Sequence, residues 1–258
     1  MDPMNVIVCV KQIPDPALPG ELDPSTNTLK RDGKLILDES DSYGVEMALQ
    51  LVNTAGEGAV TLVSMAPNDE VSGLRTALAM GAEKAVLVSD PTLAGADALT
   101  TAKVLAGAVG KAGDYDLIIA GTESSDGYTG TVPEQIAEVL GLPSVTFAKT
   151  IVVDGATVKV ERQTESGYDE VTCPTPAVVS VTAGVVEPRY PSFKGIMAAK
   201  SKPVETATAA DLGIESVSWA QSITGVEDAP AREAGEIIED DGETFNKIVE
   251  FLDNLKVI

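Results

Sequence analysis

The chain of 258 residues contains no histidine, only two cysteines and few basic side chains. Without histidine, no histidine-based catalytic triad and no histidine-ligated zinc site can form. Cys9 and Cys173 lie far apart and match no metal-ligand spacing, so we expect two free thiols in a reducing compartment, the cytoplasm. Forty acids against 18 bases give a formal net charge of −22, which disfavours nucleic acid and anionic membranes as partners.

Long hydrophobic runs are also missing. No apolar stretch approaches the roughly 18 residues that suggest a membrane-spanning helix. The first ten residues lack the charged start and apolar core of a signal peptide. We therefore expect no membrane insertion. A chain of this length can bury a substantial core, as one large or two modest domains.

Short β-branched runs alternate with amphipathic stretches through about residue 145, which is typical of βαβ units and a parallel sheet. The expected strands are residues 6–10, 59–65, 85–88 and 117–120, and the expected helices cover about 45–52, 71–81 and 98–109. After Pro143, valines on both sides of Asp154-Gly155 predict a hairpin, and residues 170–181 predict one or two further strands. The sequence thus predicts an α/β fold with an antiparallel extension at the sheet edge.

The C-terminal part, residues 205–258, is strongly acidic and has little periodicity before an expected helix from Glu243 to Leu255. Such a segment has little core of its own, so an arm wrapped on another subunit and a flexible tail are both open. We divide the chain into an α/β nucleotide-binding domain, residues 1–183, and a second part, residues 184–258, made of a recognition loop and the arm.

A loop rich in glycine, serine and threonine joins an expected strand to an expected helix within residues 120–143. Thr131 and Glu134 have the spacing of a capping box, which specifies a helix start. Backbone amides at such a start can receive a phosphate, which approaches past Gly127 and Gly130 without side-chain obstruction. An ordinary structural turn is the alternative. The P-loop and GxGxxG fingerprints are absent.

The segment EPRYPSFKGIMAAKSKP, residues 187–203, carries four basic side chains and no acid after Glu187. Pro191 and Gly195 favour a loop over a packed helix, and the loop has an apolar tip. Charges can steer an acidic partner while an apolar anchor holds it, so this segment predicts a docking surface. A solvated loop is the alternative.

Two weaker candidates remain. Four acids surround a helix start: Asp38, Glu39, Asp41 and Glu46. One interpretation is that they bind a metal or act as acid and base. The other is that they only compensate the helix dipole. Arg162, on an expected strand, either approaches an anionic cofactor or faces a cross-strand acid.

Several stretches together resemble a known family: RTALAMGAEKAVLV, AGTESSDGYTGTVPEQIAEVLGLP, VERQTESGYDEV, PAVVSV and the basic segment. The chain is similar, over nearly its whole length, to the beta (small) subunit of electron transfer flavoproteins, and most of all to actinobacterial members. The resemblance implies a parallel-sheet nucleotide-binding domain of the adenine nucleotide alpha hydrolase-like type, with an antiparallel extension and an extended C-terminal arm.

The resemblance also implies a function. Members of the family are heterodimers of an alpha and a beta subunit that accept electrons from acyl-CoA and related dehydrogenases through one FAD, held mainly by the alpha subunit. They pass the electrons to a quinone oxidoreductase. The beta subunit holds an AMP with a structural role. The chain is therefore expected to be an electron carrier subunit without bond-making chemistry of its own.

The same resemblance implies three groups of site residues in this chain. The expected AMP contacts are Cys9, Asp38, Glu39, Ser40, Asp41, Met65, Ser124, Ser125, Asp126, Gly127, Tyr128, Thr129, Gly130, Thr131 and Val132. Arg162 and Gln163 are expected near the flavin. The expected dehydrogenase-binding residues are Pro191, Ser192, Phe193, Lys194, Gly195, Ile196, Met197 and Lys200, with Phe193 as the apolar anchor.

The chain departs from the family pattern at three places. Gln163 stands where many members have Glu, Pro16 where some have a Tyr that faces the flavin, and residues 38–41 read DESD where others have an NPF-type sequence. Some relatives bifurcate electrons and hold a second FAD in place of AMP. A stand-alone nucleotide-binding signalling protein is a further alternative. An ATP pyrophosphatase needs a phosphate loop after the first strand, and residues 11–20 do not supply one.

Overall fold

The computed structural model describes residues 3–66, 68–214, 219–227, 229–231, 235, 237–239 and 241–257. The chain divides into two units, Met1–Ile223 and Thr224–Ile258. The first unit extends well past the boundary expected at residue 183, because a helix and a strand that follow this position pack on the α/β core.

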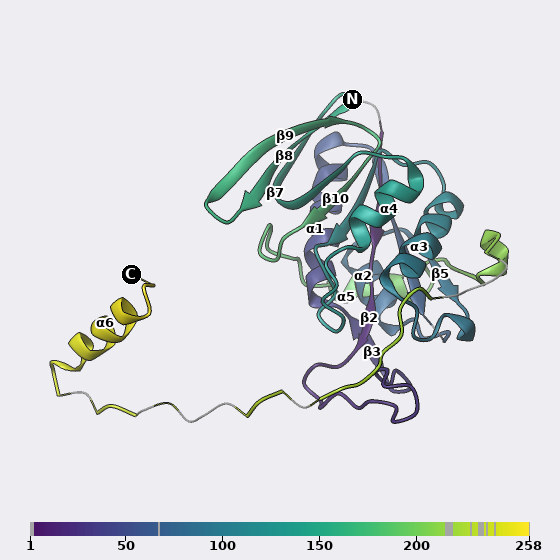
Figure 1. Ribbon diagram of the computed structural model, residues 1–258. Coiled ribbons are helices and arrows are strands. Elements are labelled where there is room, and N and C mark those ends of the chain that lie inside the picture. Colours follow the sequence, from purple (N-terminus) through teal and green to yellow (C-terminus); the bar gives the residue numbers. More distant parts are fainter. Residues whose placement is uncertain are drawn as a thin grey trace. The chain divides into compact units, whose positions relative to one another are not determined.

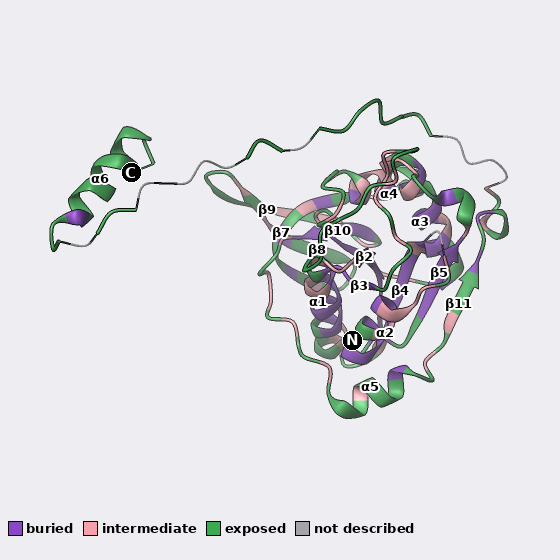
Figure 2. Cartoon of the chain, turned by 90° about the horizontal axis from the view of Figure 1, so that it is seen from below, coloured by how far each residue is buried: buried purple, intermediate pink, exposed green. Residues whose placement is uncertain are grey.

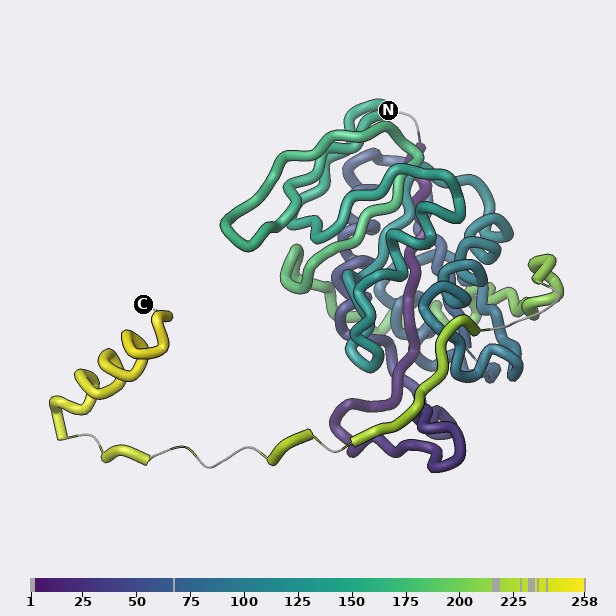
Figure 3. The backbone as a smooth tube through the Cα atoms, viewed as in Figure 1, coloured from purple at the N-terminus to yellow at the C-terminus, as the bar shows by residue number. Residues whose placement is uncertain are grey.

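A nine-stranded sheet runs through the first unit, in the order β11-β5-β4-β1-β6-β10-β7-β8-β9 (Figures 1 and 3). The central strands are parallel, as the alternation of short apolar runs and helices predicts. Their bounds are β1 Met4–Cys9, β4 Gly58–Ala66, β5 Lys84–Ser89, β6 Leu117–Gly121, β10 Ala177–Val181 and β11 Val204–Ala207. The four strands expected before residue 121 are confirmed.

Helices cover both faces of the parallel part of the sheet, because its strands bury side chains on both sides. Val6 and Val8 of β1 belong to one core, with α1 (Glu39–Ala55) and α2 (Ser72–Met80). Ile7 and Cys9 point to the other core, with α3 (Ala98–Ala112) and α4 (Val132–Leu140). This strand alternation produces two cores on opposite faces of one sheet. In Figure 2 the strands between the helices are largely buried.

The antiparallel extension is formed by β7 (Ser144–Asp154), β8 (Thr157–Thr164) and β9 (Gly167–Pro174). β7 pairs with β10 in parallel and with β8 in antiparallel orientation, so it joins the two parts of the sheet. Asp154 pairs with Thr157 at the hairpin, and Gly155 adopts the left-handed conformation that this turn requires, with φ 55°. The hairpin expected at Asp154-Gly155 is confirmed.

Two short strands, β2 (Gln12–Pro14) and β3 (Leu35–Leu37), form a separate antiparallel pair that the sequence does not predict. In the connection between these two strands, Leu22 and Leu29 form an isolated antiparallel β-bridge. Buried Gln12 accepts from the amides of Gly73 and Leu74 and donates to the carbonyl of Glu70 (2.7 Å), which ties β2 to the start of α2.

The middle of the basic segment is a helix and not the expected loop. Residues Phe193–Ala199 form α5, and Ser192 caps it, because its hydroxyl accepts from the amide of Gly195 at 3.0 Å. Gly195 lies against α2: a Cβ at this position would be 2.4 Å from the carbonyl oxygen of Ala79. Glycine therefore serves a close contact between helices here, and does not break the helix.

The second unit contains one helix, α6 (Thr244–Asn254), among its described residues. Glu243 and Leu255 flank it, so the helix expected from Glu243 to Leu255 is confirmed. Its apolar side chains are largely exposed, among them Phe245, Ile248 and Phe251.

Candidate functional site

A cavity of about 730 Å³ opens where the central parallel strands end. Its floor comes from the carboxyl ends of three neighbouring strands, with Cys9 in β1, Met65 in β4, and Ala120 and Gly121 in β6. The strand order reverses at β1, because β4 and β6 lie on its two sides. A crevice at such a switch point is the usual ligand site of open α/β sheets.

The loop between β6 and α4 forms one wall of this cavity through Ser124, Asp126, Gly127, Thr129 and Gly130. Tyr128 and Gly130 adopt left-handed backbone conformations, with φ 49° and 61°. Such turns help to direct successive N–H groups into an anion-binding concavity. Within the described part of the chain, the amides of Gly127, Thr129 and Gly130 donate to no protein acceptor.

Two other amides of the loop are used inside the protein. The amide of Ser125 donates to Asp38 Oδ2 at 2.7 Å, and that of Tyr128 donates to the carbonyl of Ser124 at 3.0 Å. Asp38 also caps α1, because its Oδ1 accepts from the amide and the hydroxyl of Ser40. The buried Asp38 carboxylate therefore ties the loop to the start of α1 and serves structure, which agrees with the helix-dipole alternative for this acid cluster. That Asp38 also caps α1 is not predicted from the sequence.

The capping box expected from Thr131 and Glu134 is wrong. Thr131 precedes α4 at φ −127° and ψ −6°, outside the extended region typical of a capping residue, and its side chain makes no capping hydrogen bond. Its hydroxyl instead lies 3.5 Å from Gln135 Nε2. The start of α4 therefore leaves its first amides to be satisfied by other means.

Three charged side chains, those of Lys11, Arg31 and Asp126, form a cluster at the loop between β6 and α4. Lys11 Nζ is 2.6 Å from Asp126 Oδ1 and 3.1 Å from Ser124 Oγ, and Arg31 pairs with the other oxygen of Asp126. Burial opposes ionisation of Asp126, but Lys11 and Arg31 outweigh it and hold its pKa below the ordinary value. The two cations thereby fix the loop in place.

Neither Lys11 nor Arg31 is among the site residues taken from the sequence. Lys11 lies just past β1, a position at which ligand-binding side chains concentrate, so strand prediction alone could have indicated it. Arg31 reaches the cavity from the long connection between β2 and β3, and no local pattern signals this. The cavity is also lined by Leu22, Leu29, Asn68 and Leu93, which the sequence did not single out.

Nine of the fifteen expected AMP contacts line the cavity: Cys9, Asp41, Met65, Ser124, Asp126, Gly127, Thr129, Gly130 and Val132. Asp38, Ser40 and Ser125 connect the loop with the start of α1, and Thr131 directly precedes α4 without capping it. Glu39 and Tyr128 are exposed and do not line the cavity. The structure therefore brings most of these residues to one place.

Asp41 and Cys9 give the inner end of the cavity its chemistry. Asp41 Oδ2 accepts from the backbone amide of Lys11 at 2.6 Å. Burial, and then the charge of Asp38, raise the pKa of Asp41 to about 8. Burial and the charge of Asp41 raise the pKa of Cys9 to about 12, so its free thiol stays protonated and unreactive.

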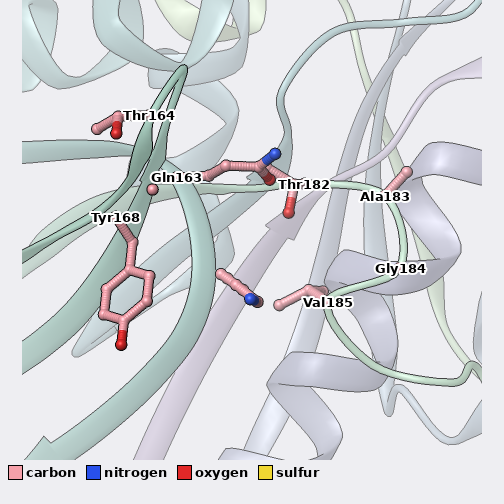
Figure 4. A pocket seen from close by; sticks show the side chains of 9 residues that line it. Gln163, Thr164, Tyr168, Thr182, Ala183, Gly184 and Val185 are labelled. Atoms are coloured by element: carbon pink, nitrogen blue, oxygen red, sulfur yellow. The ribbon is translucent and has the colours of Figure 1, made fainter. Parts of the chain in front are cut away.

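A smaller cavity of about 340 Å³ lies beside the antiparallel extension. Figure 4 shows Gln163 and Tyr168 of the β8–β9 hairpin facing the segment from Thr182 to Val185 across it. Lys149 of β7 also lines this cavity, and its ammonium lies 5.8 Å from the centre of the Tyr168 ring. An aromatic ring, an amide and hydroxyl groups suit a flat polar ring system.

Arg162 does not line the smaller cavity. It lies on β8 opposite Asp169 of β9, and its Nε donates to Thr146 Oγ1 at 3.4 Å. The cross-strand acid named as an alternative is therefore present. Gln163, the neighbour of Arg162 on β8, is the residue of this pair that reaches the cavity.

The expected docking residues lie on α5 and directly next to its two ends. Phe193 is 81% exposed and Tyr190 is 92% exposed, and Ile196 and Met197 are about half exposed. The apolar tip is thus outside the core, as expected.

Only part of the expected positive charge faces outward. Arg189 forms a bidentate pair with Glu46 of α1. The ammonium of Lys202 donates to the carbonyls of Leu78 and Ala82. Lys194 and Lys200 are exposed, so the charge available for steering is about half of that counted in the sequence.

The described residues contain no group of three or more acids and cysteines placed to hold a metal ion. The interpretation of the acids around Asp38 as a metal site therefore has no support among these residues. Among the described helices, none has the length and apolar character to cross a membrane.

Replacing Asp41 tests the electrostatics at the inner end of the cavity. A carboxyl whose pKa rises from 3.8 to about 8 on folding binds an extra proton in the folded state between these values. Stability is therefore lost as the pH rises through this window, by at most about 1.4 kcal/mol per pH unit. We expect Asp41→Asn, which mimics the protonated side chain, to flatten this dependence. Urea unfolding at pH 5 to 9 measures it.

The exposed Glu39→Gln on the same helix is the matched control and should leave the slope unchanged. Equal slopes in the wild type and in Asp41→Asn would show that Asp41 is ionised in the folded protein.

Comparison with known proteins identifies the family. Residues 26–212 match the electron transfer flavoprotein domain family. The chain is 39% identical to electron transfer flavoprotein subunit beta of Mycobacterium tuberculosis H37Rv, covering 98% of this chain and 99% of that protein. It is 41% identical to the Mycobacterium leprae subunit beta, with the same coverage. It is 33% identical to the caffeyl-CoA reductase-Etf complex subunit CarD of Acetobacterium woodii, covering 95% of each chain. The chain belongs to the electron transfer flavoprotein beta subunit family.

Proposed function

We propose that this chain is the beta subunit of a heterodimeric electron transfer flavoprotein. It pairs with an alpha subunit, which holds most of the FAD, accepts electrons from acyl-CoA and related dehydrogenases, and passes them to a quinone oxidoreductase. The observation that carries the proposal is the cavity at the strand ends, which collects nine of the residues that the family resemblance assigns to a nucleotide. The chain is a carrier, since the flavin takes up and releases the electrons.

The larger cavity holds AMP in this proposal. The amides of Gly127, Thr129 and Gly130 are unused within the described protein and would receive the phosphate. Cys9, Met65 and Leu93 give apolar surface for the base. AMP supplies no redox chemistry here, and its role is to fill and stabilise the crevice.

The smaller cavity faces the flavin in this proposal. Gln163 and Tyr168 offer an amide and an aromatic ring to one side of a flat ring system. Bound flavin supplies the electron chemistry. Gln163 orients the ring by hydrogen bonding and adds no charge, unlike the Glu that is common at this position.

A second candidate function is that of an electron-bifurcating subunit with a second FAD in place of AMP. The cavity volume of about 730 Å³ favours it, as do the apolar side chains of Leu22, Leu29 and Ile223 away from the loop. These leave room for a larger ligand than a nucleoside monophosphate. The two candidates differ in the nucleotides that the heterodimer contains.

The nucleotide content of the heterodimer tests both candidates. We expect denaturation of the purified heterodimer to release one FAD and one AMP per dimer. Gly130→Val should lower the AMP content at least severalfold, because a β-branched side chain is strained at φ 61° and obstructs the approach of a phosphate. Chromatography of the released nucleotides gives both ratios.

Gly155→Val is the matched control, since Gly155 has a similar φ of 55° but lies in the β7–β8 turn and does not line the cavity. Two FAD and no AMP would reject AMP in favour of the bifurcating subunit. AMP retained by Gly130→Val after dialysis would place the phosphate elsewhere.

The face of α5 docks the dehydrogenase in this proposal. Phe193 is the anchor, because it is large, apolar and 81% exposed. Burying such a side chain in a pocket of the partner makes a hot spot. Phe193→Ala should therefore cost about 2 kcal/mol of binding. The half-saturating concentration of an acyl-CoA dehydrogenase in flavin reduction measures this, and flavin content should stay normal.

The double variant with Lys194→Ala and Lys200→Ala is the contrast to Phe193→Ala. These exposed charges steer encounter, so their loss should slow association and flatten its dependence on salt. An unchanged half-saturation in Phe193→Ala would return this face to ordinary solvated surface.

The C-terminal arm packs on the alpha subunit in this proposal. Phe245, Ile248 and Leu252 recur at helical spacing along α6, and of these Phe245 and Ile248 are exposed while Leu252 is half-buried. A helix this short is marginal in water by itself, so an apolar partner surface stabilises it.

A substitution on α6 tests this assignment. Ile248→Asp places a charge on the apolar face and should weaken the heterodimer about tenfold or more, because burying an unpaired charge is costly. Glu250→Gln, on the same helix, should have no effect. Sedimentation across a concentration series measures the dissociation constant. Equal constants for Ile248→Asp and the wild type would make the arm a flexible tail.

A further inference from the structure

The basic segment, residues 187–203, here called the docking segment, is attached to the α/β unit at both of its ends. Its N-terminal end meets α1 through Arg189, and its C-terminal end meets α2 through Arg75 and Lys202. Between these attachments stand the exposed side chains of Tyr190 and Phe193 (Figure 2 shows α5 as a largely exposed helix). Because these large side chains do not pack into the core, the segment is held by its two attachments and by the contact of Gly195 with α2.

The attachment to α1 is a dense set of charge-assisted hydrogen bonds. Arg189 Nε donates to Glu46 Oε2 at 2.6 Å and Arg189 Nη2 donates to Glu46 Oε1 at 2.9 Å. The backbone amide of Arg189 also donates to Glu46 Oε2, at 3.2 Å. The Glu46 side chain is only 5% exposed, whereas that of Arg189 is 40% exposed. One buried carboxylate thus fixes both the backbone and the side chain at the entry to the segment.

Glu46 is held ready for this contact. Gln50, one turn further along α1, donates to Glu46 Oε1 at 2.9 Å. Burial opposes ionisation of Glu46, but the hydrogen bonds from Arg189 and Gln50 outweigh it and hold the pKa of Glu46 below its ordinary value. The carboxylate is therefore charged at neutral pH, and Gln50 helps to fix the orientation in which it meets Arg189.

The attachment to α2 uses backbone acceptors. Arg75 Nη1 donates to the carbonyls of Ala199 and Lys202, at 2.6 and 2.7 Å. Lys202 Nζ donates to the carbonyls of Leu78 and Ala82. With Gly195 in contact with Ala79, these bonds hold α5 close along α2. The entry, however, is held to α1 mainly by Glu46.

We propose that Glu46 is a positioning residue for dehydrogenase docking: through Arg189 it fixes the entry of the docking segment, so that Tyr190 and Phe193 are held in the orientation that the partner binds. This inference rests on the proposed docking role of α5 and deepens it. Its physical basis is that a segment ordered in advance loses less conformational entropy on binding. Removing the contact should thus weaken docking although Glu46 touches no partner.

The experiment uses the intact heterodimer and the reduction of its flavin by an acyl-CoA dehydrogenase. We expect Glu46→Gln to raise the half-saturating dehydrogenase concentration about fivefold to tenfold, while the maximal rate and the flavin content stay unchanged. Arg189→Lys keeps the charge but loses the bidentate geometry, and should give an intermediate value. Glu57→Gln removes the same charge from an exposed acid just past α1 and should match the wild type.

A double-mutant cycle separates the pair from general destabilisation. If Glu46 acts through Arg189, Glu46→Gln combined with Arg189→Gln should raise half-saturation no more than either change alone. Effects that multiply would overturn the inference. Limited trypsin digestion gives a second readout: cleavage after Lys194 should become severalfold faster in Glu46→Gln. An unchanged cleavage rate, or a lower melting temperature with unchanged half-saturation, would also overturn it.

Phe193→Ala, measured in the same series, separates the docking role of α5 from the positioning role of Glu46. If Phe193→Ala leaves half-saturation unchanged, the docking role of α5 fails. If Phe193→Ala raises it and Glu46→Gln does not, docking stands and only the positioning role of Glu46 fails.

Discussion

The parallel pairing of β1 with both β4 and β6 is the constraint on which the first unit depends. The connections from these strands leave in opposite directions, so the strand ends separate and a crevice remains between the loops that follow them. The same pairing sends Val6 and Val8 to one core and Ile7 and Cys9 to the other. The cavity and the two cores are thus consequences of one arrangement of strands.

Charge is used locally in a chain that is strongly acidic as a whole. Lys11 and Arg31 meet on Asp126 at the mouth of the cavity, and Arg189 meets Glu46 below the docking segment. In both places a carboxylate with little exposure receives cations from chain segments that are distant in sequence. Such pairs add little net stability, because desolvation offsets attraction, but breaking one leaves a charge unpaired in a buried place. Their effect is to fix the position of a loop or helix that carries function.

Much of the fold and part of the site could be predicted from sequence. The four parallel strands β1, β4, β5 and β6, the Asp154-Gly155 hairpin and the helix after Glu243 follow from local patterns, namely β-branched runs, turn residues and helical spacing. The loop after β6 also has a local signature, its glycines and hydroxyls. Lys11 could be indicated only by its place just past the first strand, and Arg31 could not be assigned at all, because it meets Asp126 from the long connection between β2 and β3 only when the chain has folded. Local pattern also misled at Thr131, whose backbone conformation in the fold prevents the expected cap.

The order and kind of residues along the chain are enough to predict the main parallel strands, the Asp154-Gly155 hairpin and the last helix, and they exclude histidine chemistry, because each of these depends on local pattern or on composition. Tertiary structure decided which charges are available. Of the four cations near α5, two are turned inward by Glu46 and by the carbonyls of α2. It also decided that residues 193–199 form a helix and that Val204–Ala207 join the sheet, since α2 and β5 supply the contacts that stabilise these short segments. The physical reason is that such segments gain too little from their own hydrogen bonds to order alone, and only packing against distant parts of the chain compensates the lost entropy.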